Sequence, residues 1–361
     1  MKVGVITFHR ALNYGAVLQA YALQQSIERL GYQCEIVDYQ CQHLLRGSRV
    51  LPQINAGPRT FLSGVAHAPL KVTRHVLFRR FRSRHLRTSL RRYDAASISE
   101  ANAHFDTFVV GSDQVWNPAL TGDDDTYLLA FCNDSKKKIS YAASLGRSEF
   151  QPEHEDRYLR QLSSFDAISV RELDSSRYLS RVLKREVPCV LDPVFLLPTE
   201  EWIALSRSSG LEKPYIFVYC LHEESVYRYA EHVRRLTGLP VVHVPPSLRT
   251  RVAGTRVLAF SPEEFLGWIR NAAFVITDSF HALAFSVVFS RPFKAQMKLA
   301  FPELNSRMSS LLSVLGLEEQ VLSQRDYEST MPPVTNYADA MVRLAASRQR
   351  SLKFLEEALR C

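Results

Sequence analysis

The chain has 361 residues, of which 46% are hydrophobic and 23% charged, and its formal net charge is +8 at pH 7. This composition is typical of a globular protein of roughly two domains and excludes collagen-like, coiled-coil and disordered chains. No apolar run is long enough for a transmembrane helix, and the first residues lack the pattern of a signal peptide, so we expect a cytoplasmic protein. The cysteines are scattered without a CxxC pair, which favours buried free thiols over a disulfide framework or a zinc site.

Apolar, β-branched runs alternate with amphipathic stretches along nearly the whole chain. Residues 16–31 show a clear helical pattern, because apolar positions recur at intervals of three and four before Gly31. This alternation predicts parallel sheets with helices on both faces. The predicted strands, in chain order, are 2–8, 34–39, 105–111, 137–144, 166–171, 188–192, 214–220, 240–244 and 272–278.

The alternation is interrupted at residues 196–214. We therefore predict an α/β fold of two Rossmann-like, doubly wound domains, 1–200 and 205–340, followed by a C-terminal helix over 341–361. Two such domains leave a central cleft at the carboxyl ends of their strands, where ligands bind in these folds. Segment 42–100 is poor in strand signals and is interpreted as an insertion into the first domain.

The net positive charge is concentrated in residues 71–92, which are rich in arginine and contain no acidic residue. Val, Leu and Phe are interleaved with the basic residues of this segment. One interpretation is a solvated basic helix that covers the edge of the core. Another is a surface that meets anionic lipid headgroups or a pyrophosphate-linked substrate. RNA is a third alternative, but no nucleic-acid motif accompanies the patch, so we expect an anionic membrane and no nucleic acid.

Polar residues cluster just past predicted strand ends, and the first group is Asn13, Tyr14 and Gly15. They precede a helix, whose N-terminus can hold an anion or a sugar hydroxyl. The alternative is that Asn13 only caps the helix and Gly15 permits close packing. The stretch does not match GxGxxG, so a dinucleotide site is disfavoured.

The second group, Ser112, Asp113, Gln114 and Trp116, follows the strand at 105–111. A carboxylate, an amide and an aromatic ring together suit a carbohydrate, whose hydroxyls need hydrogen-bond partners and whose C–H face stacks on a ring. The alternative is that Asp113 is a turn residue and Trp116 belongs to the core. The sequence does not match GxSxG, which disfavours a nucleophile elbow.

Arg171 ends the predicted strand at 166–171, where its planar guanidinium suits a carboxylate or a phosphate. The alternative is a structural ion pair with Glu172 or a helix carboxylate. Arg307, on a later helical pattern, is a weaker candidate for the same role, and a helix-surface arginine is the simpler interpretation.

Residues 276–286 read ITDSFHALAFS and place His281 in the first turn of a predicted helix. Asp278 or Ser279 can cap this helix, whose dipole attracts an anion. The dipole also lowers the pKa of a lone histidine, but a bound phosphate or carboxylate reverses the local field. His281 is therefore a candidate general acid that becomes charged when an anionic substrate binds; the alternative is a neutral core histidine.

Asp123, Asp124 and Asp125 form a rival motif that resembles the Asp-x-Asp metal clamp of some glycosyltransferases. They stand in a polar loop and not at a strand end. A solvated acidic turn is the favoured interpretation, and we predict no metal site.

Several motifs occur in one order and together resemble the polysaccharide pyruvyl transferase family over residues 3–317: NYGAVLQAYAL, FVVGSDQVWNP, ISYAASLG, ISVRE, VLDPVFLL, TDSFHALAFS and SRMSSLLSVLGL. The resemblance implies a glycosyltransferase-B-like pair of domains. It also implies transfer of a carboxyethylidene group from phosphoenolpyruvate to two hydroxyls of a sugar, in a capsule, exopolysaccharide or cell-wall polymer. Arg171 and the histidine at 281 match family positions at the phosphoenolpyruvate site, so Asp278, Ser279 and Phe280 are expected beside the donor.

The assignment of acceptor contacts to Asn13–Gly15 and to Ser112, Gln114 and Trp116 is our inference from loop position, with Asp113 as the base. The family suggests a galactose bridged between its 4- and 6-hydroxyls, and the basic patch suggests a lipid-pyrophosphate-linked acceptor at the inner face of the plasma membrane. The chemistry needs no cofactor besides the donor substrate. The alternatives are a glycosyltransferase that uses a nucleotide sugar and a non-catalytic glycan-binding relative.

Overall fold

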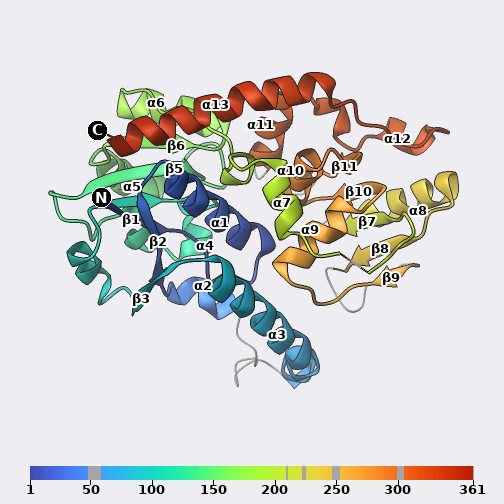
Figure 1. The fold of residues 1–361 in the computed structure, drawn as a ribbon, viewed down its shortest axis with the longest axis horizontal. Helices are drawn as coiled ribbons and strands as arrows, with labels where there is room; N and C mark the ends of the chain where they lie inside the picture. Colours follow the sequence, from blue (N-terminus) through green and yellow to red (C-terminus); the bar gives the residue numbers. More distant parts are fainter. Residues whose placement is uncertain (48–57, 209, 222–224, 246–252, 299–304, 361) are drawn as a thin grey trace. The chain divides into compact units, whose positions relative to one another are not determined.

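The computed structural model describes residues 1–47, 58–208, 210–221, 225–245, 253–298 and 305–360 (Figure 1). The chain divides into two compact units: unit 1 comprises Met1–Leu196 and Arg350–Cys361, and unit 2 comprises Leu197–Gln349. The division lies close to the boundary expected from the sequence. The return of the last residues to unit 1 was not predicted.

Unit 1 is built on a parallel sheet with the strand order β3-β2-β1-β4-β5-β6, which is the order of a Rossmann fold. In the central strand, Val5 lies opposite Ile36 on one side and Val109 on the other, and all three side chains are buried. Continuous apolar runs form these strands because helices cover both faces of a parallel sheet. The strands are β1 (Lys2–Ile6), β2 (Gln33–Tyr39), β3 (Thr88–Tyr93), β4 (Thr107–Val110), β5 (Lys137–Ala143) and β6 (Ala167–Val170).

Helix α1 shows how local sequence sets the helix boundaries of unit 1. The Asn13 side chain accepts the N–H of Ala16 at 3.2 Å and so caps the start, and Gly31 follows the end with a φ of 87°. The helices of unit 1 are α1 (Tyr14–Arg29), α2 (Gln42–Gly47), α3 (Pro58–His85), α4 (Pro118–Thr121), α5 (Pro152–Leu162) and α6 (Leu173–Leu183), with short 3-10 turns η1 (Ile98–Ala103), η2 (Asp125–Leu128) and η3 (Pro193–Phe195).

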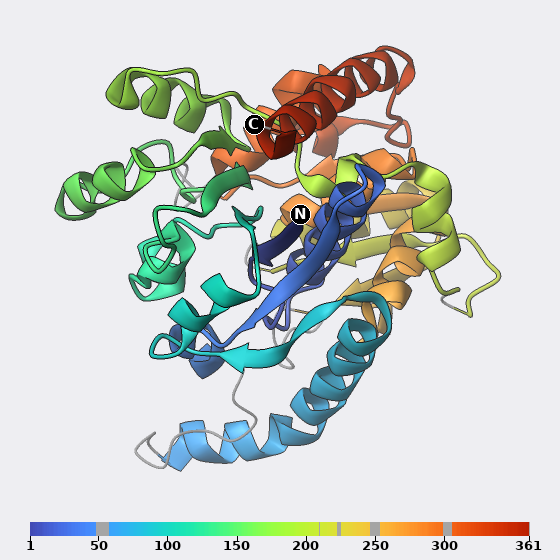
Figure 2. The same ribbon diagram turned by 60° about the vertical axis from the view of Figure 1, so that its left-hand side comes forward.

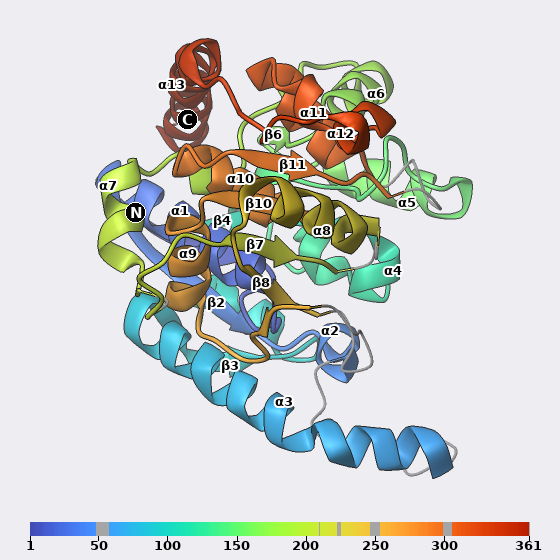
Figure 3. The ribbon, with the colours of Figure 1, turned by 90° about the vertical axis from the view of Figure 1, so that its right-hand side faces the viewer.

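Segment 42–100 differs from the prediction of an insertion. It supplies β3, the edge strand of the sheet, and the long helix α3 that leads into it (Figure 2 and Figure 3). The basic stretch is therefore helix only as far as His85 and continues as a strand. The strand escaped detection because its alternation is weak: Leu90 is fully exposed at 106%, and arginines follow it.

Unit 2 has a second parallel sheet with the order β11-β10-β7-β8-β9. Val275 of its central region lies opposite Phe217 and Phe293, and all three are fully buried. The strands are β7 (Ile216–Tyr219), β8 (Val241–Val244), β9 (Thr255–Arg256), β10 (Phe274–Thr277) and β11 (Phe293–Ala295). The helices are α7 (Thr199–Leu205), α8 (Ser225–Thr237), α9 (Pro262–Arg270), α10 (Phe280–Val288), α11 (Ser306–Leu315) and α12 (Gln324–Glu328), with the 3-10 turn η5 (Glu318–Gln320).

The C-terminal helix α13 (Ala338–Arg360) contributes residues to both units. Leu355 and Leu359 from its last turns are buried in the core of unit 1, in the cluster that contains Val3 and Leu23. The stretch at 188–192, predicted as a strand, forms only an isolated bridge between Cys189 and Val170. The central cleft expected from the fold class stays a prediction.

Candidate functional site

The carboxyl edge of the unit 1 sheet gathers polar side chains at the point between β1 and β4 where the strand order reverses. Ligands of doubly wound folds bind at such a switch point. Here the Thr7 hydroxyl donates to the carbonyl oxygen of Ser112 at 3.0 Å, and the Gln19 amide donates to the Thr7 hydroxyl at 2.8 Å. The loops after β1 and β4 are therefore held together by buried hydrogen bonds.

Arg171, directly after β6, is the centre of a buried ion cluster. Its Nη1 donates to Asp192 Oδ2 at 2.6 Å, its Nε lies 3.5 Å from Glu172 Oε1, and its Nη2 lies 3.6 Å from Asp113 Oδ1. Only 1% of the Arg171 side chain is exposed, and the Asp192 and Glu172 side chains are fully buried. Burial alone would lower the pKa of Arg171, but the surrounding carboxylates outweigh it and raise the pKa, so the guanidinium stays charged.

Neighbouring hydroxyls complete the cluster. The Ser112 hydroxyl donates to Asp192 Oδ2 at 2.9 Å, and the Ser144 hydroxyl donates to Glu172 Oε1 at 2.5 Å. Asp192 was not among the predicted site residues, although its position at the end of the apolar run 188–192 gave a signal of the same kind as the others. Arg171 thus makes the structural ion pairs that the sequence left open as an alternative, and its contact with a donor stays a prediction.

Asp113 has a strained backbone at this edge, with a φ of 80° in the left-handed region that few residues other than glycine adopt. Its Oδ1 accepts the N–H of Gln114 at 2.9 Å, and 10% of its side chain is exposed. Backbone strain of this kind is concentrated at functional sites, and the role of Asp113 as the base stays a prediction.

The predicted acceptor residues have different surroundings. The Trp116 ring is fully buried, packs edge-on against Phe165 and donates from Nε1 to the Tyr127 carbonyl oxygen, so it offers no face to a sugar and belongs to the core. Gln114 accepts a hydrogen bond from the Asn117 amide at 2.8 Å.

At the start of α1, Asn13 caps the helix, as the alternative interpretation had it, and remains exposed. Tyr14 is buried, with its ring 5.0 Å from that of Phe78 in α3. Gly15 is also buried. Of these three, only Asn13 is accessible to a ligand in unit 1.

His9, Arg10 and Asp38 form a second polar cluster in unit 1 that the sequence analysis missed. His9 is 1% exposed, its Nε2 lies 3.0 Å from Asp38 Oδ1, and Arg10 donates to both Asp38 oxygens at 2.6 and 2.7 Å. Burial raises the pKa of Asp38, but the hydrogen bonds and charges of His9 and Arg10 outweigh it and hold the pKa well below its usual range. One indication of this cluster was present in the sequence, because the basic pair His9 and Arg10 directly follows the first predicted strand.

Unit 2 has its own switch point between β7 and β10. The Thr277 hydroxyl donates to the Tyr219 carbonyl oxygen at 2.7 Å, and Asp278 Oδ1 accepts the N–H of Leu221 at 2.7 Å. These hydrogen bonds join the two strand ends directly before α10. The predicted donor residues Asp278 and Ser279 are both buried here.

His281 lies in the first turn of α10, as predicted, and 7% of it is exposed. Ser279 occupies the N-cap position, but its side chain makes no capping hydrogen bond. The first turn contains no acidic side chain, and the buried Asp278 directly precedes the N-cap. The Phe280 ring contacts the His281 imidazole edge-on, with 5.1 Å between the ring centroids. Arg307, the weaker candidate for a donor contact, lies half-buried in the first turn of α11.

The three consecutive aspartates are engaged by protein groups. Asp123 and Asp125 both form ion pairs with Arg157, whereas Asp124 accepts hydrogen bonds from the Tyr39 hydroxyl and the N–H of Thr126. No group of three His, Cys, Asp or Glu residues within the described part of the chain could hold a metal ion. The metal-clamp interpretation therefore gains no support.

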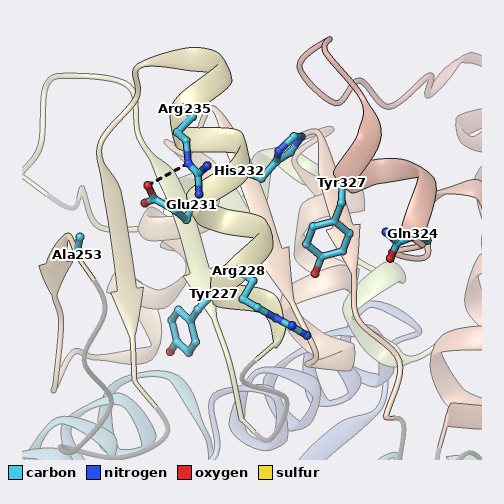
Figure 4. A pocket seen from close by; sticks show the side chains of 8 residues that line it. All are labelled: Tyr227, Arg228, Glu231, His232, Arg235, Ala253, Gln324 and Tyr327. Carbon is cyan, nitrogen blue, oxygen red and sulfur yellow. Dashed lines mark ion pairs between the residues drawn. The ribbon is translucent and has the colours of Figure 1, made fainter.

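A cavity of about 690 Å³ lies along one face of α8 in unit 2 (Figure 4). Several of its polar groups are already engaged: Glu231 pairs with Arg235 at 3.4 Å, and His232 Nε2 lies 3.1 Å from the Ser329 carbonyl oxygen. The lining residues are Tyr227, Arg228, Glu231, His232, Arg235, Ala253, Gln324 and Tyr327.

The two sheets define a two-domain α/β fold of the glycosyltransferase-B type, and one solved structure with a TM-score above 0.5 supports this class of fold. The UDP-GlcNAc 2-epimerase from Neisseria meningitidis bound to UDP-GlcNAc is similar with a TM-score of 0.51 and 10% identity, over 99% of this chain and 100% of that one. The UDP-GlcNAc 2-epimerase from Methanocaldococcus jannaschii has a TM-score of 0.49 and 10% identity, over 96% and 99% of the chains. The glycosyltransferase SnogD from Streptomyces nogalater has a TM-score of 0.44 and 13% identity, over 99% and 98%. At such identities the similarity concerns the fold alone.

The sequence defines the family. The family model for polysaccharide pyruvyl transferases matches residues 13–293, which include both Arg171 and His281, and the chain belongs to this family. A search of curated proteins for sequence relatives gives no match. The family implies a transferase with a pyruvate donor and a sugar or polysaccharide acceptor. Among the helices of the described residues, none has the length and apolar character needed to cross a membrane.

Proposed function

We propose that the protein transfers a carboxyethylidene group from phosphoenolpyruvate to two hydroxyls of one sugar and so forms a pyruvate ketal. The observation that supports this most directly is the buried His281 at the start of α10, beside the switch point of the unit 2 sheet. A helix N-terminus whose first turn has no acidic side chain can bind a carboxylate or phosphate group through its free N–H groups. A histidine in that turn can deliver a proton to such a ligand.

The reaction needs one proton at C3 of the enol phosphate, which makes C2 electrophilic. One sugar hydroxyl then attacks C2, the C2–O bond to phosphate breaks, and the second hydroxyl closes the ketal ring. Of the two hydroxyl protons, one restores the acid and the other leaves with the phosphate. We assign the acid to His281, with Asp278, Ser279 and Phe280 around the donor, and the base to Asp113.

Arg171 has two roles that can be separated. As a donor ligand it would bind a carboxylate or phosphate through its fork; as a positioning residue it would hold Asp113 and Asp192 in place through their ion pairs. Arg171→Lys keeps the charge and loses the fork, so a donor role predicts a raised KM for phosphoenolpyruvate. An unchanged donor KM together with a lower kcat would identify a positioning residue.

The acceptor is proposed to be a sugar of a capsule, exopolysaccharide or cell-wall polymer, with a 4,6-bridged galactose as the first candidate. The family supports the polysaccharide, and the linkage is our proposal. A lipid-pyrophosphate-linked oligosaccharide at the inner face of the plasma membrane would suit the basic face of α3. Residues 39–93 contain no Asp or Glu, and Arg79, Arg80 and Arg84 are exposed and form no ion pair within the described part of the chain.

The test is incubation of the protein with phosphoenolpyruvate and a panel of glycosides, followed by measurement of released phosphate and of glycoside mass. Pyruvyl transfer predicts phosphate release together with the mass increase of one carboxyethylidene group. Turnover with nucleotide sugars and none with phosphoenolpyruvate would favour a glycosyltransferase. Glycan binding with no turnover of either donor would favour a non-catalytic relative. A thermal-shift comparison of the two donor classes gives an independent readout.

A further inference from the structure

A cavity of about 620 Å³ in unit 1 has no role in the reaction as described so far. Its volume lies within the range of small-molecule sites. It opens at the carboxyl ends of β2 and β3 and against the loops that follow β4, which is the edge of a doubly wound sheet where ligands bind. The residues that line it are Tyr39, Gln40, Cys41, Gln42, His43, Arg46, Ala95, Ile98, Thr121, Gly122, Asp124, Asp125, Thr126, Ala130 and Phe131.

One wall of the cavity is fixed by hydrogen bonds. The Tyr39 hydroxyl donates to Asp124 Oδ2 at 2.5 Å, and Asp124 Oδ1 accepts the N–H of Thr126 at 3.0 Å. Burial and the neighbouring Asp124 raise the pKa of Tyr39, so its hydroxyl remains a donor. Both oxygens of Asp124 are thus used in building the wall.

Gly122 brings the opposite segment close. It has a φ of 66°, and a Cβ atom at this position would lie 2.5 Å from Nδ1 of His43. A residue with a Cβ atom at position 122 would therefore require the His43 side chain to shift. The glycine allows the loop after α4 to lie close to His43 at this side of the cavity.

Other polar groups of the cavity are open to a ligand. Gln42, His43 and Arg46 are exposed, and their side chains form no hydrogen bond or ion pair with the described residues. Gln40 is half-buried beside them, and Asp125, whose side chain is 46% exposed, forms an ion pair in which Nη1 of Arg157 lies 3.7 Å from its Oδ1. Amide, imidazole, guanidinium and carboxylate groups together supply both donors and acceptors.

This set of side chains fits a neutral polyhydroxylated ligand better than an anion. Each sugar hydroxyl donates and accepts, and the cavity offers both kinds of partner within a few residues. The lining includes the carboxylates of Asp124 and Asp125 as well as the guanidinium of Arg46, so these groups together give no net positive charge that would select a phosphate. The half-buried ring of Phe131 supplies an apolar surface for the C–H face of a sugar.

We infer that this cavity is a saccharide subsite that holds the sugar to be modified or its neighbour in the acceptor chain. The inference rests on the proposed function, since a pyruvyl transferase must hold a polyol acceptor. It assigns acceptor recognition to the segment 40–46 and to Asp125, none of which was predicted from the sequence.

The test compares the wild-type chain with the double variant Gln42→Ala/Arg46→Ala and with Arg160→Ala. Arg160 is an exposed arginine of α5 that does not line the cavity, so it controls for the loss of surface charge. Because Gln42 and Arg46 are exposed, the double variant should fold normally, which an unchanged thermal midpoint would verify. The probes are methyl β-galactoside, methyl β-glucoside and methyl β-mannoside, with binding followed by saturation-transfer NMR without phosphoenolpyruvate.

The inference predicts that at least one glycoside binds the wild type and Arg160→Ala equally, and binds the double variant about tenfold more weakly or not at all. Equal binding to all three proteins, or no binding of any probe to the wild type, overturns it. Phosphate release from phosphoenolpyruvate with the same glycosides tests the reaction separately from binding to the cavity. If wild type and double variant both release phosphate with the same acceptor KM, pyruvyl transfer is retained and the subsite is refuted. Cavity-dependent binding without phosphate release keeps the subsite and refutes the transfer.

Discussion

Replacing Arg171 by methionine should destabilise unit 1 strongly, because it removes the guanidinium that pairs with Asp113, Glu172 and Asp192. The Asp192 and Glu172 side chains are fully buried and the Asp113 side chain is 10% exposed, so water cannot replace the guanidinium. Removing one partner of a buried ion pair costs about 3–5 kcal/mol. Since several carboxylates face Arg171, we expect a loss near the upper end, about 5 kcal/mol at pH 7.

The loss of stability in Arg171→Met should depend on pH, and the direction of this dependence follows from the protonation of the buried carboxylates. Without the cation, burial raises the folded-state pKa of Asp192 and Glu172 above its unfolded value. A carboxyl group of this kind destabilises the fold at pH values above the unfolded pKa, and the penalty shrinks as the pH falls and the group takes up a proton. The difference between wild type and Arg171→Met should therefore be smaller at pH 5 than at pH 7. Adding Asp192→Asn should recover part of the loss in a double-mutant cycle.

Urea unfolding measures these differences, and tryptophan fluorescence can report on unit 1 alone. The chain has three tryptophans, of which Trp116 is in unit 1 and Trp202 and Trp268 are in unit 2. In a Trp202→Phe/Trp268→Phe background the signal comes from Trp116. The matched control is Arg181→Met, which removes an exposed arginine paired with Glu149 and should leave the midpoint unchanged. A loss below about 1 kcal/mol for Arg171→Met, or the same loss at both pH values, would refute the reasoning.

Three further outcomes follow from the contacts described above. His281→Gln should lower phosphate release from phosphoenolpyruvate by at least about 100-fold with an unchanged thermal midpoint, and a folded variant of near-normal turnover would remove His281 from the acid role. Asp38→Asn should cost about 1–3 kcal/mol at pH 7, because the lowered pKa of Asp38 means that the ionised form stabilises the fold. That cost should begin to shrink below about pH 4, where Asp38 of the unfolded chain takes up a proton while the folded carboxyl group is still ionised, so a urea midpoint difference that is constant with pH would contradict it. Arg79→Glu/Arg80→Glu/Arg84→Glu should weaken sedimentation with phosphatidylglycerol vesicles and leave binding to neutral vesicles unchanged, whereas unaltered sedimentation would exclude this face of α3.

The architecture could be predicted from the sequence because strands covered on both faces form continuous apolar runs. Strands β3, β9 and β11 were missed, and all three lie at the edges of their sheets. Strand β3 has exposed arginines, and β9 and β11 have only two or three residues. Edge position and shortness both remove the hydrophobic pattern on which such predictions depend.

The candidate site was predicted in part. The rule that ligands bind past strand ends placed Asp113, Arg171 and His281 at the carboxyl edges of their sheets, as the structure has them. The contact between Arg171 and Asp192 depends on how segments far apart in the chain pack together, which a local pattern does not contain. Trp116 shows the same limit, since a tryptophan after a strand end has the same sequence context whether it is buried or exposed.

The return of residues 350–361 to unit 1 has a consequence for biosynthesis. Leu355 and Leu359 complete a cluster of side chains that otherwise comes from the first two hundred residues. On the ribosome, all of unit 2 must therefore be translated before that cluster can close, and the apolar surface around Val3 and Leu23 stays uncovered during this interval. We therefore expect a nascent chain of this topology to expose part of its first half for longer than a chain whose first unit closes on its own residues.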